Sequence, residues 1–183
     1  MRTPVRTMHL LVLCAALAVA GCTTKPDSVT TPDAVESWSA EDEAEAVQEA
    51  EQAVRDWMRT SSQCLDDPPN TDPSCFDEVS YGTLLRDDRA ALEYAQENGV
   101  RYIGEATYVR TDRVVKVDLS IGPDKEVRLA GCQSIEGFDI LYADGTSMIS
   151  DWPRRERFIY VVLKHTSKWQ LADILEDPEG SEC

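Results

Sequence analysis

The sequence predicts an α+β fold in which N-terminal helices pack on a curved antiparallel sheet. Up to residue 99, apolar side chains recur at intervals of three and four, the period of a helix with one buried face. From Val100 onward the interval falls to two, the period of a strand. A run of helices followed by a run of strands is typical of the α+β class.

The first 22 residues have the pattern of a bacterial lipoprotein signal. Arg2 and Arg6 give a charged start, residues 10–20 form an apolar run, and small side chains precede Cys22. The segment Val19-Ala20-Gly21-Cys22 resembles the lipobox of bacterial lipoproteins, with valine where leucine is commonest. We therefore expect residues 1–21 to be removed as a signal peptide. Cys22 then becomes the lipidated N-terminus, with palmitate-type acyl chains in the cell membrane and the protein on its extracytoplasmic side. An ordinary secretory signal is the alternative; a membrane span needs about 20 apolar residues, more than this run contains.

Residues 22–38 are predicted to be the lipidated cysteine followed by a flexible tether. They are mostly Thr, Ser, Pro, Asp and Ala, with few large apolar side chains. Such a segment behaves as a flexible chain, with an r.m.s. reach of about 20–25 Å. One α+β domain, from 39 to 183, is expected to follow, and it is long enough to bury a single core.

Ser39 is expected to begin the first helix, because acidic residues in the first turns complement the positive end of the helix dipole. An apolar stripe then follows one face and indicates that this face packs on a core. The acidic residues are Glu41, Asp42, Glu43 and Glu45, and the stripe is Val47, Ala50, Val54, Trp57 and Met58.

The segment from Cys64 to Cys75 is expected to be a loop, because it is rich in Pro, Asp and Asn. A short helical turn is expected near residues 76–80. A second helix is predicted over Asp87–Asn98, with Gly99 as a left-handed stop. Its apolar side consists of Leu84, Leu85, Ala91, Leu92 and Ala95.

Six strands are predicted in the C-terminal half. The segment from Phe158 to Leu163 is apolar on both faces, as is typical of a central strand. Asp144-Gly145 and Thr166-Ser167 are the expected hairpin turns. The predicted strands are 100–110, 113–121, 126–134, 138–142, 155–165 and 168–175.

The chain is acidic, with 34 Asp and Glu against 18 Lys and Arg. Removal of residues 1–21 takes away Arg2 and Arg6 and changes the formal net charge from −16 to −18. The segment 154–157 holds the only local concentration of positive charge, so nucleic acid is not expected as a partner. Anionic head groups repel such a protein, so the acyl chains are expected to hold it at the membrane.

Four cysteines remain after the signal and the lipidated residue, and they predict two structural disulfides in an oxidising compartment. Three pairings are possible for Cys64, Cys75, Cys132 and Cys183. Pairing the two that are close in the chain leaves Cys132 with Cys183, a loop of about 50 residues worth roughly 4 kcal/mol in the chain-entropy model. A metal site is not expected, because the sequence lacks Cys-x-x-Cys and has only one histidine after the signal.

Helices followed by antiparallel strands in a domain of this length resemble the nuclear-transport-factor-2-like (SnoaL/cystatin-like) fold, in which a curved sheet wraps around helices to form a cone. The chain also looks like small actinobacterial lipoproteins with this fold. The shared features are the lipobox, the tether, the opening helix, Cys132, the Asp144-Gly145 turn, the strand Trp169-Gln170-Leu171 and Cys183. Another helix-plus-sheet envelope domain is the alternative.

Enzymes of this fold family, such as SnoaL-like cyclases, epoxide hydrolases and ketosteroid isomerases, place Asp, His, Tyr or Arg inside the cone. Here His165 is expected at a hairpin turn and Asp118 on the polar side of its strand, so neither is assigned as a catalytic residue. Strand tyrosines are the candidates for lining a ligand pocket, although such residues more often pack with one end in water. They are Tyr102, Tyr108 and Tyr160, with Tyr142.

No cofactor is predicted. The loop offers oxygen ligands from Asp66, Asp67, Asn70 and Asp72, but it lacks the Asp-x-Asp-x-Asp-Gly spacing and the closing glutamate of a calcium loop. A Gly-rich phosphate loop and a Gly-x-Ser-x-Gly elbow are also missing from the sequence. An enzyme of a familiar kind is therefore not expected.

The predicted function is a non-catalytic cell-envelope lipoprotein whose tethered domain binds an envelope protein or a small apolar ligand. Anchoring raises the effective concentration of the domain for membrane-bound partners. One alternative is an enzyme that uses the cavity of the cone, which requires ionisable side chains that converge in an apolar pocket. The other is a structural spacer, without a sizeable pocket or an apolar patch.

Overall fold

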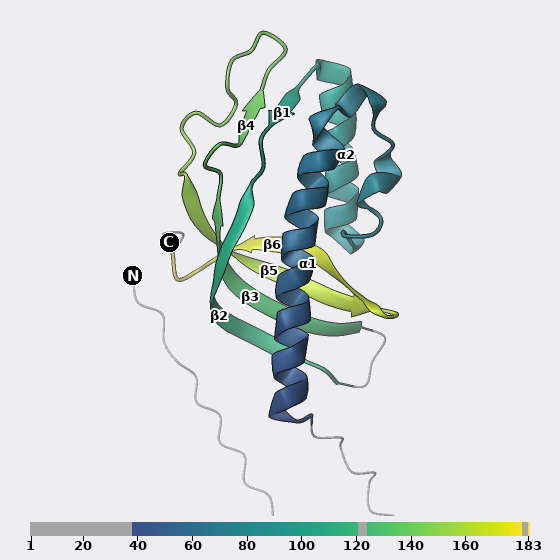
Figure 1. Ribbon diagram of the computed structural model, residues 1–183, viewed down its shortest axis with the longest axis vertical. Coiled ribbons are helices and arrows are strands. Elements are labelled where there is room, and N and C mark those ends of the chain that lie inside the picture. Colours follow the sequence, from purple (N-terminus) through teal and green to yellow (C-terminus); the bar gives the residue numbers. More distant parts are fainter. Residues whose placement is uncertain (1–37, 121–123, 181–182) are drawn as a thin grey trace, which may run out of the picture. The chain divides into compact units, whose positions relative to one another are not determined.

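The computed structural model describes residues 38–120, 124–180 and 183. The predicted signal peptide, Cys22 and the tether up to residue 37 lie outside the described residues. Trp38–Cys183 form one compact unit of the α+β class (Figure 1). Its elements are α1 (Ala40–Asp66), 3-10 turns at Pro68–Asn70 and Pro73–Phe76, α2 (Gly82–Asn98), β1 (Arg101–Ile103), β2 (Thr107–Asp118), β3 (Asp124–Ser134), β4 (Asp139–Leu141), β5 (Arg155–His165) and β6 (Lys168–Glu176).

The strands form two antiparallel sheets. The larger has the order β2-β3-β5-β6, and the smaller is a ribbon of β1 and β4. The predicted break between the first two strands is wrong, because it falls at Gly104–Ala106 and not near residue 111. Gly104 has φ +75° and approaches the carbonyl of Gly137 so closely that a Cβ atom would clash. The chain therefore leaves the ribbon at a glycine that the alternation of side chains does not reveal.

The two edges of the larger sheet differ. The backbone of β6 is covered at Leu171, which exchanges hydrogen bonds of 3.0 and 2.9 Å with Val79 and Tyr81. The other edge, β2, has three register shifts against β3, which leave Val109, Asp112 and Val115 unpaired. Repeated bulges coil an edge strand and discourage its pairing with another chain.

The first helix lies across one face of the larger sheet (Figure 1). Ser39 caps it as predicted, and its side chain forms a capping box with Asp42. The helix continues to Asp66, so Cys64 belongs to it and not to the loop. Its buried face packs on the sheet and forms the main core; the residues are Ala46, Ala50, Ala53, Val54 and Met58 from α1, with Val127, Leu129, Tyr160, Val162 and Leu171 from the strands.

The second helix begins five residues before the predicted start. Its N-cap, Tyr81, makes no side-chain capping bond, so the usual signal for a helix start is missing. Gly99 ends the helix in the left-handed conformation with φ 65°, as predicted. The helical turn expected near 76–80 lies earlier, at Pro73–Phe76, because Pro73 follows the capping residue Asp72. Within the described ranges, no helix has a stretch long and apolar enough to cross a bilayer.

The prediction of a central strand is confirmed, since β5 has a neighbour on each side. The turn at Thr166 is also found, with φ 58°. The disulfides are Cys64–Cys75 and Cys132–Cys183. The first ties the end of α1 to the 3-10 turn beside a small core of Cys64, Phe76 and Leu92.

Candidate functional site

Two of the predicted pocket residues, Tyr108 and Tyr160, meet inside the main core. Their rings pack edge to face with centroids 5.3 Å apart, and Tyr160 is fully buried. The Tyr108 hydroxyl lies 2.7 Å from Thr111 Oγ1, and the Tyr160 hydroxyl donates to Gln133 Oε1 at 3.2 Å. Burial raises the pKa of Tyr108 to about 12 and raises that of Tyr160 further. Both phenols therefore stay protonated and fill space between α1 and the sheet.

Gly131 of β3 makes room for this pair. A Cβ atom at this position would overlap the ring and hydroxyl of Tyr108. Arg55 holds Tyr108 from the helix side, with Nη1 donating to the Tyr108 carbonyl at 2.9 Å and the guanidinium 4.9 Å from the ring centroid. An open hollow of about 210 Å³ beside Tyr108 is lined also by Arg55, Met58 and Arg59. Tyr108 thus borders solvent at one end of a packed interior.

The other two tyrosines lie together elsewhere, on the small ribbon. Tyr102 of β1 is opposite Ile140 of β4. Because side chains alternate along a strand, Phe138, Ile140 and Tyr142 share one side of the β4 segment. The Tyr102 and Phe138 rings are 6.3 Å apart. Burial raises the pKa of Tyr102, and the nearby Tyr94 of α2 makes a smaller contribution in the same direction. We call Tyr94, Tyr102, Phe138, Ile140 and Tyr142 the aromatic ribbon face.

This face is partly open to solvent, because two of its five residues are exposed and three are half-buried. Tyr94 is 47% exposed and Tyr142 is 44% exposed, and Ile103 on the other side of the ribbon is 48% exposed. The ribbon of β1 and β4 lies near the C-terminal end of α1 (Figure 1). A helix of this length spans about 40 Å, so the aromatic ribbon face is remote from residue 38, where the described part of the chain begins.

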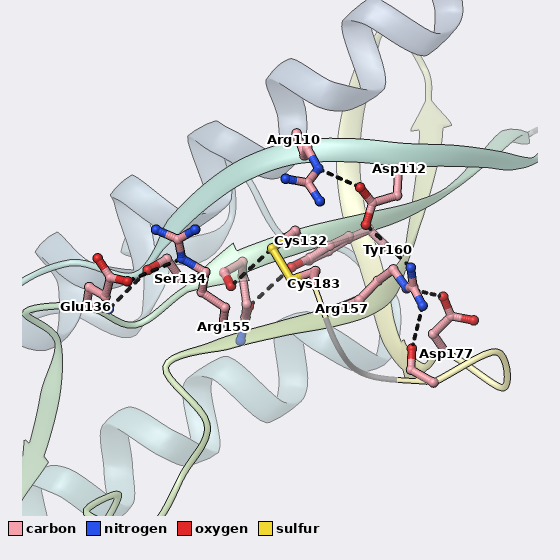
Figure 2. The surroundings of a disulfide bond; sticks show 12 residues. Arg110, Asp112, Cys132, Ser134, Glu136, Arg155, Arg157, Tyr160, Asp177 and Cys183 are labelled. Atoms are coloured by element: carbon pink, nitrogen blue, oxygen red, sulfur yellow. Dashed lines mark hydrogen bonds and ion pairs between the residues drawn. A yellow bond between two sulfur atoms is a disulfide. The ribbon is translucent and has the colours of Figure 1, made fainter.

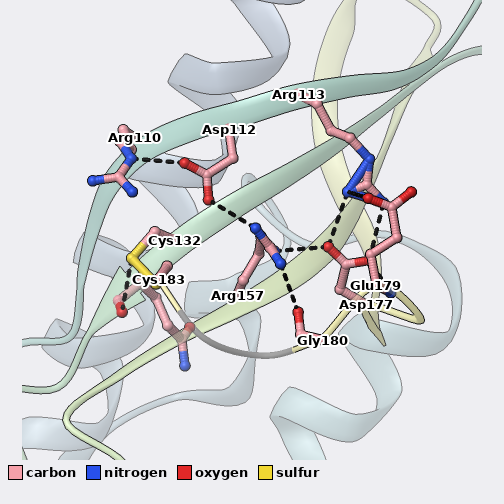
Figure 3. Close-up of polar contacts among 10 residues, drawn as sticks. Arg110, Asp112, Arg113, Cys132, Arg157, Asp177, Glu179, Gly180 and Cys183 are labelled. Carbon is pink, nitrogen blue, oxygen red and sulfur yellow. Dashed lines mark hydrogen bonds and ion pairs between the residues drawn. A yellow bond between two sulfur atoms is a disulfide. The ribbon is translucent and has the colours of Figure 1, made fainter.

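A second cluster lies on the sheet face away from α1, where the C-terminal segment crosses the strands. The side chain of Asp177 is fully buried there and accepts from Arg113 Nη1 and Nη2 at 3.0 and 2.9 Å. Arg157 Nε is 2.9 Å from Asp177 Oδ2, and Arg157 Nη2 donates to the Gly180 carbonyl at 2.9 Å (Figure 3). The Cys132–Cys183 disulfide lies beside this cluster (Figure 2).

The cluster binds the C-terminal segment to the sheet. Each guanidinium faces carboxylates, since Arg157 also approaches Asp112 at 3.6 Å and Arg113 approaches Glu179 at 3.4 Å. Paired charges of this kind hold a chain in place and leave little free charge for a ligand. The sequence reveals the group of arginines near residue 157, but it does not reveal Asp177, because the partners of Asp177 are distant in the chain.

A partly buried carboxyl lies between the two helices. Asp88 of α2 accepts hydrogen bonds from Trp57 Nε1 of α1 at 3.0 Å and from the hydroxyl of Ser80. Desolvation raises the pKa of Asp88 despite these two hydrogen bonds. Trp57 is predicted to be a core residue. In the structure it packs against the main core but is only half-buried, and its indole nitrogen donates to Asp88.

The remaining candidates occupy separate sites. His165 is at the β5–β6 hairpin, where Nδ1 lies 2.9 Å from Asp124 and the ring stacks on Tyr81. Asp118 pairs with Lys116 at 3.3 Å. In the acidic loop, Asp67 accepts from the Asn70 side chain, and Asp72 caps a 3-10 turn. Among the residues that the structure describes, there is no group of three His, Cys, Asp or Glu side chains arranged to hold a metal ion.

Comparison with known proteins gives a likeness in fold. No protein-family model matches the chain. No curated protein matches it. Among solved structures, the chain is similar to the crystal structure of the intermembrane space region of the chloroplast protein ARC6, with a TM-score of 0.51 and 18% sequence identity. The match covers 71% of this chain and 96% of that one. At this identity the likeness concerns the fold alone.

Proposed function

We propose that the chain is a cell-envelope lipoprotein whose lipidated Cys22 tethers a non-catalytic domain of the nuclear-transport-factor-2-like fold. The domain binds an envelope protein through the aromatic ribbon face. The observation that carries the proposal is the contrast between the buried Tyr108 and Tyr160 of the interior and the exposed Tyr94 and Tyr142 of the aromatic ribbon face. The helix that lies across an antiparallel sheet supports the proposed fold family.

The proposed location rests on the signal pattern and on the disulfides. The segment Val19-Ala20-Gly21-Cys22 gives the processing site. Two disulfides are typical of proteins that fold outside the cytoplasm. Once Cys22 is lipidated, the domain is confined near the membrane surface, which raises its effective concentration for partners in the same membrane.

A protein partner is favoured over a small apolar ligand. Tyr108 and Tyr160 are buried and pack on each other in the main core, and their hydroxyls have partners inside the protein. Tyrosine side chains that are half exposed are instead typical of the anchors of protein interfaces. The same exposed face argues against a structural spacer.

The surroundings of the ribbon indicate the charge of the partner. The chain segments that carry this face, 94–105 and 138–146, contain Glu97, Glu105, Asp139 and Asp144 against Arg101. Complementary charge sets the rate and the specificity of association. The proposed partner therefore offers apolar side chains surrounded by Lys or Arg.

Lipidation is tested by growth with an alkyne-bearing fatty acid, followed by click detection on the purified full chain. We expect labelling of the natural chain and no labelling of Cys22→Ser. Labelling that persists in the Cys22→Ser chain, or a soluble unlabelled natural chain, contradicts the proposal.

The binding face is tested with a photo-crosslinking amino acid in place of Tyr142 in the full chain in cells. The matched control carries it at Ser167, an exposed residue of the β5–β6 hairpin at the other end of the sheet. We expect a crosslinked protein from position 142, absent from position 167 and lost when Tyr94→Asp is added. Equal crosslinking from both positions would show that the aromatic ribbon face is not the binding surface.

A further inference from the structure

The outer face of α2 carries charges in the order that is unfavourable for an isolated helix. Arg86 and Arg89 lie in its first half, and Glu93 and Glu97 lie near its end. The helix dipole favours acidic residues at the start and basic residues at the end. The first helix follows this rule, with Glu41, Asp42 and Glu43 in its first turn. The order of these charges in α2 is therefore not explained by the helix dipole.

Three of these charges, Arg86, Arg89 and Glu93, line an open groove of about 600 Å³ along α2, bordered on one side by Pro73. Glu97 lies one residue beyond the lining residue Gln96. Lining residues recur at intervals of four and three on one stripe of the helix, which is the spacing of a surface that receives another helix. They are Gly82, Arg86, Arg89, Glu93 and Gln96, with Ala90 beside them.

The charge pattern is complementary to itself in the antiparallel direction. A twofold rotation about an axis that is perpendicular to the helix and passes near Ala90 gives an antiparallel pair of helices. In this pair the basic half of one copy lies over the acidic half of the other. In an isologous contact each residue pair occurs twice, so Arg86 would face Glu97, and Arg89 would face Glu93, in both halves of the interface. The small side chain of Ala90 lets the two helices approach at the axis.

We propose that a second copy of this chain occupies the groove, with the two α2 helices packed antiparallel about a twofold axis near Ala90. The present ion pairs of the two arginines do not prevent it. Arg86 lies 3.5 Å from Asp87 and Arg89 lies 2.5 Å from Asp77, with arginine side chains 74% and 44% exposed. Exposed pairs of this kind are worth about 0–1 kcal/mol each.

The contact is weak. One pair of helices of this length buries less than the area of about 1,200–2,000 Å² of stable interfaces. Both copies also carry a net negative charge, although salt screens the charges that lie more than about 8 Å apart at physiological ionic strength. A test must therefore link the two copies covalently while they are in contact.

The test uses full chains in cells, with a photo-crosslinking amino acid at Ala90 and two different tags after Cys183 on co-expressed copies. The matched control carries the photo-crosslinker at Ala44, an exposed alanine of α1. We expect a product of twice the mass that contains both tags from position 90 and not from position 44. A product with only one tag would show that a different protein covers α2, and no product from position 90 would also overturn the proposal.

Charge reversal tests the register. Arg86→Glu with Arg89→Glu makes the stripe wholly acidic, and Glu93→Arg with Glu97→Arg makes it wholly basic. Each variant alone is expected to lose about tenfold or more of the crosslinked product, because like charges then face one another. Co-expression of the acidic and the basic variant should restore the product, which also shows that both are folded. Two results would contradict the antiparallel pairing. One is an amount of crosslinked product that the charge reversals do not change, and the other is a failure of co-expression to restore the product.

Discussion

At the scale of single residues, the packing of the interior depends on the missing side chain of Gly131. A glycine in the middle of a strand often marks a close approach by a neighbour, and here the neighbour is the ring of Tyr108. That ring cannot easily move, because it packs on Tyr160 and on the guanidinium of Arg55.

Gly131→Ala is therefore expected to lower the free energy of unfolding by about 1–3 kcal/mol, the usual cost of overpacking a core. The measurement is urea unfolding with the disulfides intact. In a Tyr108→Leu background the same substitution should cost less, because the shorter side chain leaves room for the Cβ atom. An equal cost in the two backgrounds would mean that Tyr108 is not what the methyl group meets.

Asp88 gives a dependence of stability on pH. Its pKa is raised above the ordinary value of 3.8 by desolvation. A carboxyl with a raised pKa stabilises the folded state while it is protonated, and this contribution is lost as the pH rises through the folded pKa. Asp88→Asn keeps an oxygen that can accept from Trp57 and Ser80 but cannot ionise.

We expect Asp88→Asn to be at least as stable as the natural chain at pH 7, with the relative advantage of the variant falling as the pH is lowered to about 4 and below. Each unit of pKa difference corresponds to about 1.4 kcal/mol. The free energy of unfolding of both proteins between pH 3 and pH 8 checks this, with the exposed Asp87→Asn as a control. A variant that becomes relatively more stable toward low pH would reverse the sign of the argument.

Single residues also differ in how well the sequence predicts them. Ser39 and Gly99 act within a few residues of their own position, so their roles as helix cap and helix stop could be predicted. Asp177 could not, because its partner Arg113 is 64 residues away in the sequence and no periodic pattern connects them. The sequence also does not predict the aromatic ribbon face. Tyr102 and Tyr108 lie in different sheets, and this becomes visible only when both sheets are known.

At the scale of elements, α1 begins at a strong signal and its stability should depend on it. The Ser39 side chain accepts from the Asp42 backbone at 3.1 Å, and Asp42 accepts from the Ser39 backbone at 2.9 Å. Ser39→Ala is expected to cost about 1 kcal/mol of unfolding free energy. The control is Ser62→Ala, since the Ser62 hydroxyl only donates to the Met58 carbonyl within the helix.

The control variant should be neutral or slightly stabilising, because alanine is the better helix former in a helix interior. Chemical denaturation of both variants checks the difference. If Ser62→Ala costs as much as Ser39→Ala, then the loss reflects the serine hydroxyl in general and not the cap.

The elements that the sequence misplaced share a physical cause. Helix α2 starts without a side-chain cap, and the break before β2 depends on a close contact between the backbones of Gly104 and Gly137. Three bulges also interrupt the alternation of β2. Propensity and period describe neighbours in the chain, whereas each of these features is set by a different part of the fold.

At the scale of the whole molecule, the acidic charge belongs mainly to the helices. Residues 38–99 contain 16 acidic and 4 basic residues, against 15 and 11 in residues 100–183. The sheet is therefore close to electrical balance, and many of its arginines and lysines pair with nearby carboxylates. The proposed basic partner would be attracted mainly by the helical part of the domain, which includes Tyr94 of the aromatic ribbon face.

The two disulfides act on the whole molecule to different extents. The Cys64–Cys75 bond closes a loop with a sequence separation of 11, and the Cys132–Cys183 bond closes one of 51. In the chain-entropy model these loops correspond to about 3 and about 4 kcal/mol, because a longer loop removes more freedom from the unfolded chain. The second bond also holds the segment that carries Asp177.

Replacing both cysteines of a pair by serine should therefore cost more for Cys132 and Cys183 than for Cys64 and Cys75, by about 1 kcal/mol. Guanidinium unfolding under non-reducing conditions gives both values. Because Arg113 and Arg157 still bind Asp177 in the variant without the second bond, the C-terminal segment should stay on the sheet in the folded state. Adding Asp177→Asn to that variant should release the segment, which hydrogen exchange of residues 176–180 would detect. If the segment already exchanges freely after loss of the disulfide alone, then the covalent bond and not the buried ion pair holds it in place.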